Sequence, residues 1–92
     1  MASKAVYWNH SDVPNLSKQR QDPALLALGA AIRRVRRQKG ISQERLALLA
    51  YVDRSYAGRV ERGDNNIALL KLLKVAQALD ISLAELMAKA KL

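Results

Sequence analysis

Residues that start or stop helices recur at short intervals along the chain, and their spacing constrains the fold more than any other feature. Asp22 and Pro23 form a strong helix start, because aspartate caps the first turn and proline suits the first helical position. Gly40 and Gly63 suit the left-handed conformation that ends a helix. Segments between such signals have room only for short helices. Further start signals are Ser42, Asp53 and the capping box Ser82-Leu83-Ala84-Glu85.

Apolar residues recur at helical spacing between these signals, and no segment alternates as a half-buried strand does. The sequence therefore predicts an all-α fold. We expect a compact five-helix domain over residues 23–92, preceded by an irregular N-terminal arm over residues 1–22. The expected helices cover about residues 23–39, 43–50, 54–62, 67–79 and 83–90.

The composition excludes several classes of function. The chain has 92 residues, no cysteine and one histidine, His10, so a thiolate or histidine metal site and a Ser/His/Asp triad are not expected. No apolar run approaches the roughly 20 residues that cross a bilayer. We therefore expect no enzymatic activity, no metal ion, no cofactor and no contact with a membrane, and a location in the cytoplasm.

Positive charge is concentrated in the middle of the chain. The net charge is +8, and residues 25–63 hold nine basic and three acidic residues. Such an excess in a small domain favours a polyanionic partner, usually a nucleic acid. General solubility is the alternative explanation of a basic composition, and the uneven distribution weakens it.

The stretch Gly40–Gly63, GISQERLALLAYVDRSYAGRVERG, resembles the helix-turn-helix of Cro and phage repressors, also called the xenobiotic-response-element family. The resemblance extends over about residues 28–86 and includes Val75-Ala76-Gln77-Ala78-Leu79 near its end. It implies a lambda-repressor-like fold that binds double-stranded DNA, usually as a homodimer, and regulates transcription.

The resemblance also implies roles for single residues. The second motif helix of this family lies in the major groove, N-terminal end first. The expected base readers are Arg54, Ser55 and Arg59, and the planar donor fork of Arg54 suits guanine O6 and N7. A phosphate contact or a solvated side chain is the alternative for the two arginines.

Four residues are expected to bind phosphates of the DNA backbone. Gln43 opens the first motif helix, where its amide and the helix N-terminus act together. Tyr56 offers its hydroxyl, although its ring could instead pack on the domain. Arg62 and Asn66 follow the second motif helix, and Asn66 could instead satisfy groups of the turn.

One arginine of the first helix is expected to be structural. Arg36 falls only about 40° from the centre of the apolar stripe, which lies near Ile32. A charge so close to the core needs a partner. The resemblance supplies Glu61, so we expect an Arg36–Glu61 ion pair between the first helix and the recognition helix.

The two C-terminal helices carry more leucine than one small core needs. We expect Leu70, Leu73, Leu86 and Met87 to form a homodimer interface, and we assign Leu69, Leu72 and Leu83 to the core. A two-fold dimer would read a near-palindromic operator.

Four residues depart from the family's pattern. Ala57 replaces the usual isoleucine or valine, which thins the packing between the motif helices. Tyr51 stands where the turn often has glycine, so the turn is expected to be reshaped or strained. Ala68 replaces a capping serine or threonine, and Asp80 occupies another position often held by glycine. These changes bear on stability rather than on the class of protein.

The sequence thus predicts a sequence-specific DNA-binding transcriptional regulator, a repressor in its simplest form, of bacterial, phage or plasmid origin and associated with the nucleoid. One alternative is a controller protein of a restriction–modification system. Another is an antitoxin-like subunit that meets a protein partner through the arm, where Tyr7 and Trp8 lie.

Overall fold

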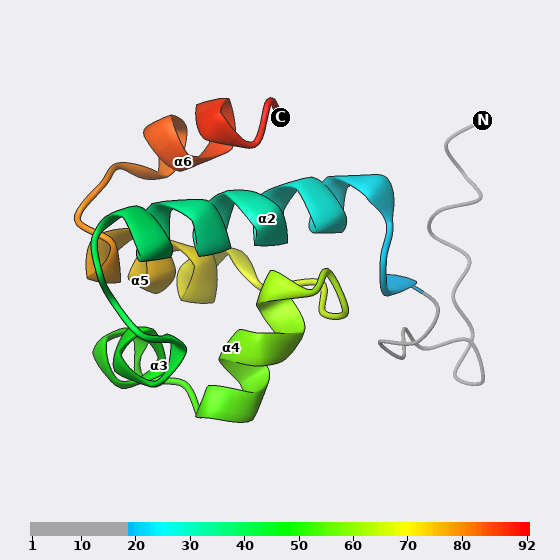
Figure 1. The fold of residues 1–92 in the computed structure, drawn as a ribbon. Helices are drawn as coiled ribbons and strands as arrows, with labels where there is room; N and C mark the ends of the chain where they lie inside the picture. The colour runs from blue at the N-terminus through cyan, green and yellow to red at the C-terminus, as the bar shows by residue number, and fades with distance from the viewer. Residues whose placement is uncertain (1–18) are drawn as a thin grey trace, which may run out of the picture.

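The computed structural model describes residues 19–92, and this part of the chain folds into five α-helices without a strand (Figure 1). The predicted all-α class is confirmed. The N-terminal arm lies almost wholly outside the described residues, together with Tyr7, Trp8 and His10. The helices are α2 (Pro23–Gln38), α3 (Gln43–Ala50), α4 (Arg54–Glu61), α5 (Leu69–Ala78) and α6 (Leu83–Lys89).

Side-chain caps fix where four of the helices begin. The caps of α2, α3, α4 and α6 each accept a hydrogen bond from a backbone N–H of the first turn; they are Asp22, Ser42, Asp53 and Ser82. The cap position of α5 is Ala68, which makes no side-chain hydrogen bond. This helix begins at Leu69 rather than at the predicted residue 67.

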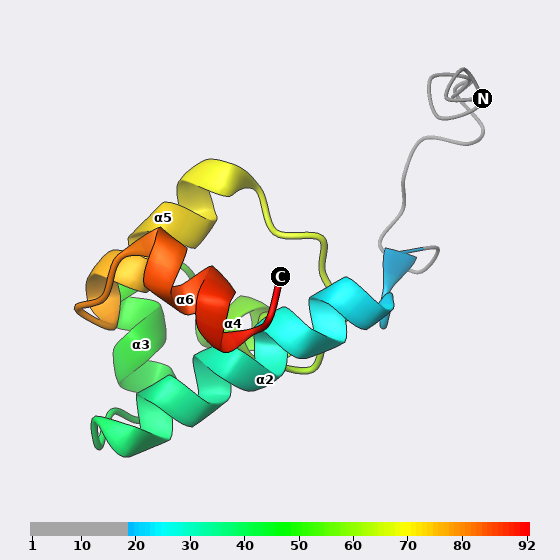
Figure 2. The ribbon, with the colours of Figure 1, turned by 90° about the horizontal axis from the view of Figure 1, so that it is seen from above.

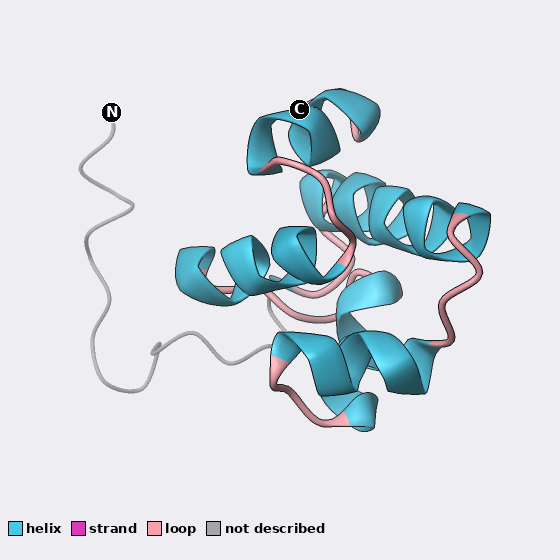
Figure 3. Cartoon of the chain, turned by 90° about the vertical axis from the view of Figure 1, so that its left-hand side faces the viewer, coloured by secondary structure: helices cyan, strands magenta, loops and turns pink. Residues whose placement is uncertain are grey.

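The helices pack around one core. Figure 1 shows α6 on one side of α2, with α3 and α4 on the other, and the view from above places α5 beside α3 and α6 (Figure 2). The side view places α5 between α6 and the α3–α4 pair (Figure 3). The largest fully buried side chains are Ile32, Leu46, Leu79 and Leu86, which come from or directly follow four different helices.

The loop after α4 holds the segment that leads into α2. The backbone N–H of Gln21 donates to the carbonyl oxygen of Gly63, and the Gln21 amide donates to the Asp64 carboxylate at 3.3 Å. The Asn66 amide donates to the side-chain oxygen of Gln19 at 3.0 Å. The start of α2 is therefore anchored beside the end of α4.

Among residues 19–92, no helix is both long enough and apolar enough to span a membrane.

Candidate nucleic-acid interface

A tight turn joins α3 to α4. Tyr51 ends α3 in the left-handed conformation, with φ 61° and ψ 40°. The next N–H, of Val52, donates to the carbonyl of Ala47 at 3.0 Å, and Asp53 then caps α4. The turn thus keeps a left-handed geometry although a tyrosine occupies it, which stores local strain. Tyr51 is 82% exposed, so burial of its side chain contributes little against this strain.

The backbones of α2 and α4 approach each other closely at Gly29. A Cβ atom added there would lie 2.5 Å from the carbonyl oxygens of both Val60 and Glu61. Only a residue without a side chain allows this approach. The contact sets the position of α4 against α2, and so the direction in which α4 presents its exposed face.

A buried ion pair joins the same two helices. Arg36 Nε donates to Glu61 Oε2 at 2.6 Å, and Arg36 Nη2 donates to Glu61 Oε1 at 3.0 Å. Arg36 Nη1 donates to the carbonyl of Ile41, and the Gln43 amide donates to Glu61 Oε1 at 3.1 Å. The two charged side chains are only 10% and 2% exposed. This network connects α2, the α2–α3 loop, α3 and α4, and its central pair is the one expected from the sequence.

Three arginines gather on the exposed face of α4. They border a surface hollow of about 330 Å³, which is open to solvent and to which α3 contributes one side chain. Most of the expected DNA-contacting residues therefore share one face. The lining residues are Gln43, Arg54, Ser55, Gly58, Arg59 and Arg62.

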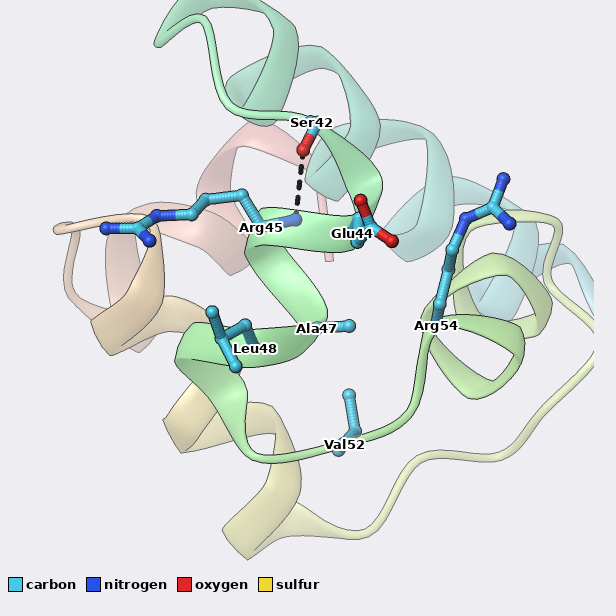
Figure 4. A pocket seen from close by; sticks show the side chains of 7 residues that line it. All are labelled: Ser42, Glu44, Arg45, Ala47, Leu48, Val52 and Arg54. Carbon is cyan, nitrogen blue, oxygen red and sulfur yellow. Dashed lines mark hydrogen bonds between the residues drawn. The ribbon is translucent and has the colours of Figure 1, made fainter.

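Arg54 stands between this hollow and a second one. The second hollow, of about 440 Å³, lies between α3 and the start of α4 (Figure 4). Figure 4 shows the side chains of Arg54 and Arg45 on opposite sides of it, with Glu44 between them. Because Arg54 borders both hollows, its guanidinium projects from the start of α4 toward solvent.

A chain of hydrogen bonds organises the start of α4. Asp53 Oδ1 accepts from the Tyr56 backbone N–H at 2.7 Å and from Ser55 Oγ at 2.8 Å. Ser55 Oγ in turn accepts from Arg59 Nη1 at 3.4 Å. The Tyr56 and Ser55 hydrogen bonds lower the pKa of the Asp53 carboxyl, and the charges of Arg59 and Lys71 add to the effect. Asp53 is therefore ionised near neutral pH.

A lysine that was not among the expected site residues approaches this face from α5. Lys71 Nζ lies 5.4 Å from the centroid of the Tyr56 ring, and the Arg59 guanidinium lies 5.7 Å from the same ring. Burial raises the pKa of the half-buried Tyr56, so its hydroxyl remains a donor. A similar contact places Lys74 5.5 Å from the Tyr51 ring. The spacing of three between the lysines was the available signal, because it places both on one side of α5.

Besides Gln43, which donates to Glu61, two further expected phosphate-binding residues have partners within the chain. Arg62 lines the arginine hollow, and its Nε donates to Asp64 at 3.2 Å. Asn66 lies instead beside Gln19 at the start of α2, and it does not line the hollow. The structure thus groups Arg62 with α4 and separates Asn66 from it.

The leucines of α5 and α6 require two corrections. Leu86 was expected at a dimer interface, but it is 0% exposed and belongs to the core. Leu69 was expected in the core, but it is 62% exposed. Leu70 is 72% exposed, whereas Leu73 and Met87 are partly buried. The exposed leucines therefore cluster at the beginning of α5.

Comparison with known proteins identifies the arrangement of α3 and α4. A family model described as helix-turn-helix matches residues 32–86, which include both motif helices. The chain belongs to the helix-turn-helix family. The resemblance to Cro and phage repressors is confirmed, and this helix-turn-helix protein is a DNA-binding transcriptional regulator.

Several relatives of the helix-turn-helix protein carry more specific descriptions. The structure of the restriction-modification controller protein C.AhdI from Aeromonas hydrophila is 52% identical, with a TM-score of 0.66 over 67% of this chain and 94% of that one. The control protein C.SmaI from Serratia marcescens is 36% identical over 67% of this chain and 74% of its own length. The clp gene regulator ClgR from Corynebacterium glutamicum is 34% identical, with a TM-score of 0.72 over 74% of this chain and 72% of that one.

Proposed function

We propose that the protein regulates transcription as a homodimer bound to a near-palindromic operator, and that it controls the genes of a restriction–modification system. The observation that carries the DNA-binding part is the exposed face of α4, where three arginines surround a solvent-open hollow. The similarity to C.AhdI and C.SmaI supports the choice of regulated genes.

In this proposal the N-terminal half of α4 reads bases in the major groove. Arg54 is exposed and donates to guanine O6 and N7, while Ser55 and Arg59 contact neighbouring base edges. Asp53 holds Ser55, and Ser55 holds Arg59, so the reading side chains are partly organised before DNA binds. Such organisation reduces the entropy lost on binding.

The remaining polar groups would hold the DNA backbone. Gln43 and Arg62 border the hollow. Tyr56 does not line it and packs partly against the core, and its protonated hydroxyl would be a further donor. Lys71 adds a cation beside Tyr56. Asn66 is the least well placed of the expected phosphate ligands, because it lies outside the α4 hollow, beside Gln19 at the start of α2.

The dimer interface would lie on α5 and α6. Leu70, with the exposed Leu69 beside it, forms an apolar surface that extends to the partly buried Leu73 and Met87. Exposed apolar clusters on a small domain usually mark an interface. A two-fold axis at this surface would place the two α4 helices about 34 Å apart, one turn of DNA.

The proposed protein acts on the bacterial nucleoid, in the cytoplasm, and its function involves no catalytic step. Binding of a protein partner through the N-terminal arm stays a prediction, because Tyr7 and Trp8 lie outside the described part of the chain.

Selection of bound sequences from random duplex DNA tests the proposal. We expect a near-palindrome with half-sites about one helical turn apart, found upstream of the protein's own gene and of restriction–modification genes. Steep salt dependence without a preferred sequence would contradict sequence-specific regulation. A selected site that occurs only upstream of unrelated genes would contradict the controller role but would still support binding to a specific operator.

A further inference from the structure

A second basic surface lies on α2, on the side away from the core. It borders a hollow of about 420 Å³, and the buried carboxylate of Glu61 contributes to its edge. We call it the α2 arginine face; its residues are Leu26, Ala30, Arg33, Arg34 and Arg37. Its three charged residues are all arginines, so the charge of the face is positive.

The charges of this face are not balanced by carboxylates of the described chain. Within residues 19–92, no acidic group lies within ion-pair distance of Arg33, Arg34 or Arg37, and Glu61 is already bound by Arg36. Arg34 Nη2 donates to the carbonyl of Lys89 at 2.9 Å, which ties it to α6. Two guanidinium groups, those of Arg33 and Arg37, therefore remain exposed with their donors available.

The α2 arginine face adjoins the hollow on α4. Gln43 lines the α4 hollow and donates to Glu61, and Glu61 lines the hollow on α2. One hydrogen bond thus separates the two basic surfaces. A duplex that lies on α3 and α4 carries one phosphate charge per about 1.7 Å of its axis, so its backbone does not end at the edge of α4.

We propose that Arg33 and Arg37 bind phosphates of the DNA backbone just outside the half-site that α4 reads. The planar guanidinium fork matches phosphate oxygens, and the one carboxylate at the edge of the face, that of Glu61, is already bound by Arg36. The proposal rests on the proposed function, because that function defines the half-site. An acidic protein segment is the alternative occupant; DNA is favoured because the face lies next to the α4 hollow, one hydrogen bond away.

The test titrates DNA affinity against salt on two duplexes. One ends at the outer edges of the selected half-sites, and the other continues with random sequence on both sides. The double variant Arg33→Ala/Arg37→Ala should lower the slope of log K against log salt on the long duplex by roughly 1.8 per half-site, since each phosphate contact contributes about 0.9. It should leave the slope on the short duplex unchanged.

A matched control removes the same charge from residues that do not line the hollow on α2. The double variant Lys89→Ala/Lys91→Ala, at the end of α6, should change the slope of log K against log salt by the same small amount on both duplexes. Equal effects of the Arg33/Arg37 variant on the two duplexes, or no effect on either, would overturn the proposal and leave the face to an acidic partner. If the wild-type protein selects no operator, the proposed function is contradicted. If it selects an operator but binds the short and long duplexes with equal affinity, only the present proposal is contradicted.

Discussion

At the residue scale, Asp53 links the start of α4 to its exposed face. Its carboxylate caps the helix through the Tyr56 N–H and also accepts from Ser55, whose hydroxyl accepts from Arg59. One side chain thus serves both helix stability and the orientation of two expected base readers. The cap was predictable from the sequence, since aspartate before a helix is a local signal. The link to Arg59 was not predictable, because that contact depends on the rotamers of the folded helix.

The lowered pKa of Asp53 predicts a pH dependence of stability. A carboxyl whose pKa is lower in the folded state stabilises the fold above its unfolded value, near 3.8, and loses that contribution as pH falls through the folded value. Asp53→Asn keeps a capping side chain but does not titrate. We expect the stability advantage of the wild type in urea unfolding to shrink as the pH falls from about 5 through the lowered pKa of Asp53. A constant difference across this range would contradict the expectation.

Arg54 and Gln43 should separate base reading from backbone binding. We expect Arg54→Ala to weaken binding to the selected operator by about 1–3 kcal/mol more than binding to random duplex. Gln43→Ala should weaken both by similar amounts, because phosphates carry no sequence information. Affinity titrations of each variant on the operator and on the random duplex measure these changes in binding free energy. The opposite pattern would show that the two roles are exchanged.

At the element scale, the position of α4 depends on its contacts with α2. Gly29 lets the two backbones meet, and the Arg36–Glu61 pair holds them together. The helix bounds themselves were largely predictable, because caps and glycines act locally. The exception is α5, which begins at Leu69 rather than residue 67, with Ala68 at its cap position and no side-chain cap. Asp80 and Tyr51 adopt positive φ where the pattern of the family suggested glycine.

Removing one member of the buried pair should destabilise the domain strongly. Arg36→Met leaves the Glu61 carboxylate with only the Gln43 amide, so we expect a loss of about 3–5 kcal/mol in the free energy of unfolding. Arg33→Met, on the exposed side of α2, is the matched control and should have little effect. Arg36→Met/Glu61→Met should recover much of the loss, because no uncompensated charge remains. Unchanged unfolding of Arg36→Met would contradict a stabilising role.

At the scale of the whole molecule, α5 has two different exposed sides. Lys71 and Lys74 lie beside Tyr56 and Tyr51 of the α3–α4 region. Leu70 belongs to the apolar surface proposed for the dimer. This division would let one helix contact the DNA backbone and the partner subunit at once.

Leu70→Glu should separate the subunits without unfolding them. The side chain is exposed, so the free energy of unfolding of the subunit should change little, while a buried charge at the interface is unfavourable. Sedimentation at tens of micromolar should show a dimer for the wild type and a monomer for the variant. Leu48→Glu, at an exposed leucine of α3, is the control and should remain dimeric. A monomeric wild type, with and without DNA, would argue against the proposed interface.

The sequence by itself determined the helical class, the caps and the family, because helix signals act over a few residues and the motif is contiguous. Tertiary structure decided which helix faces are covered. Periodicity places a side chain at an angle around its own helix axis but does not say which neighbour lies at that angle. Leu86 is therefore buried by the packing of α6, and Leu69 remains exposed where α5 extends past its neighbours. For the same reason, only the folded chain placed Lys71 beside Tyr56.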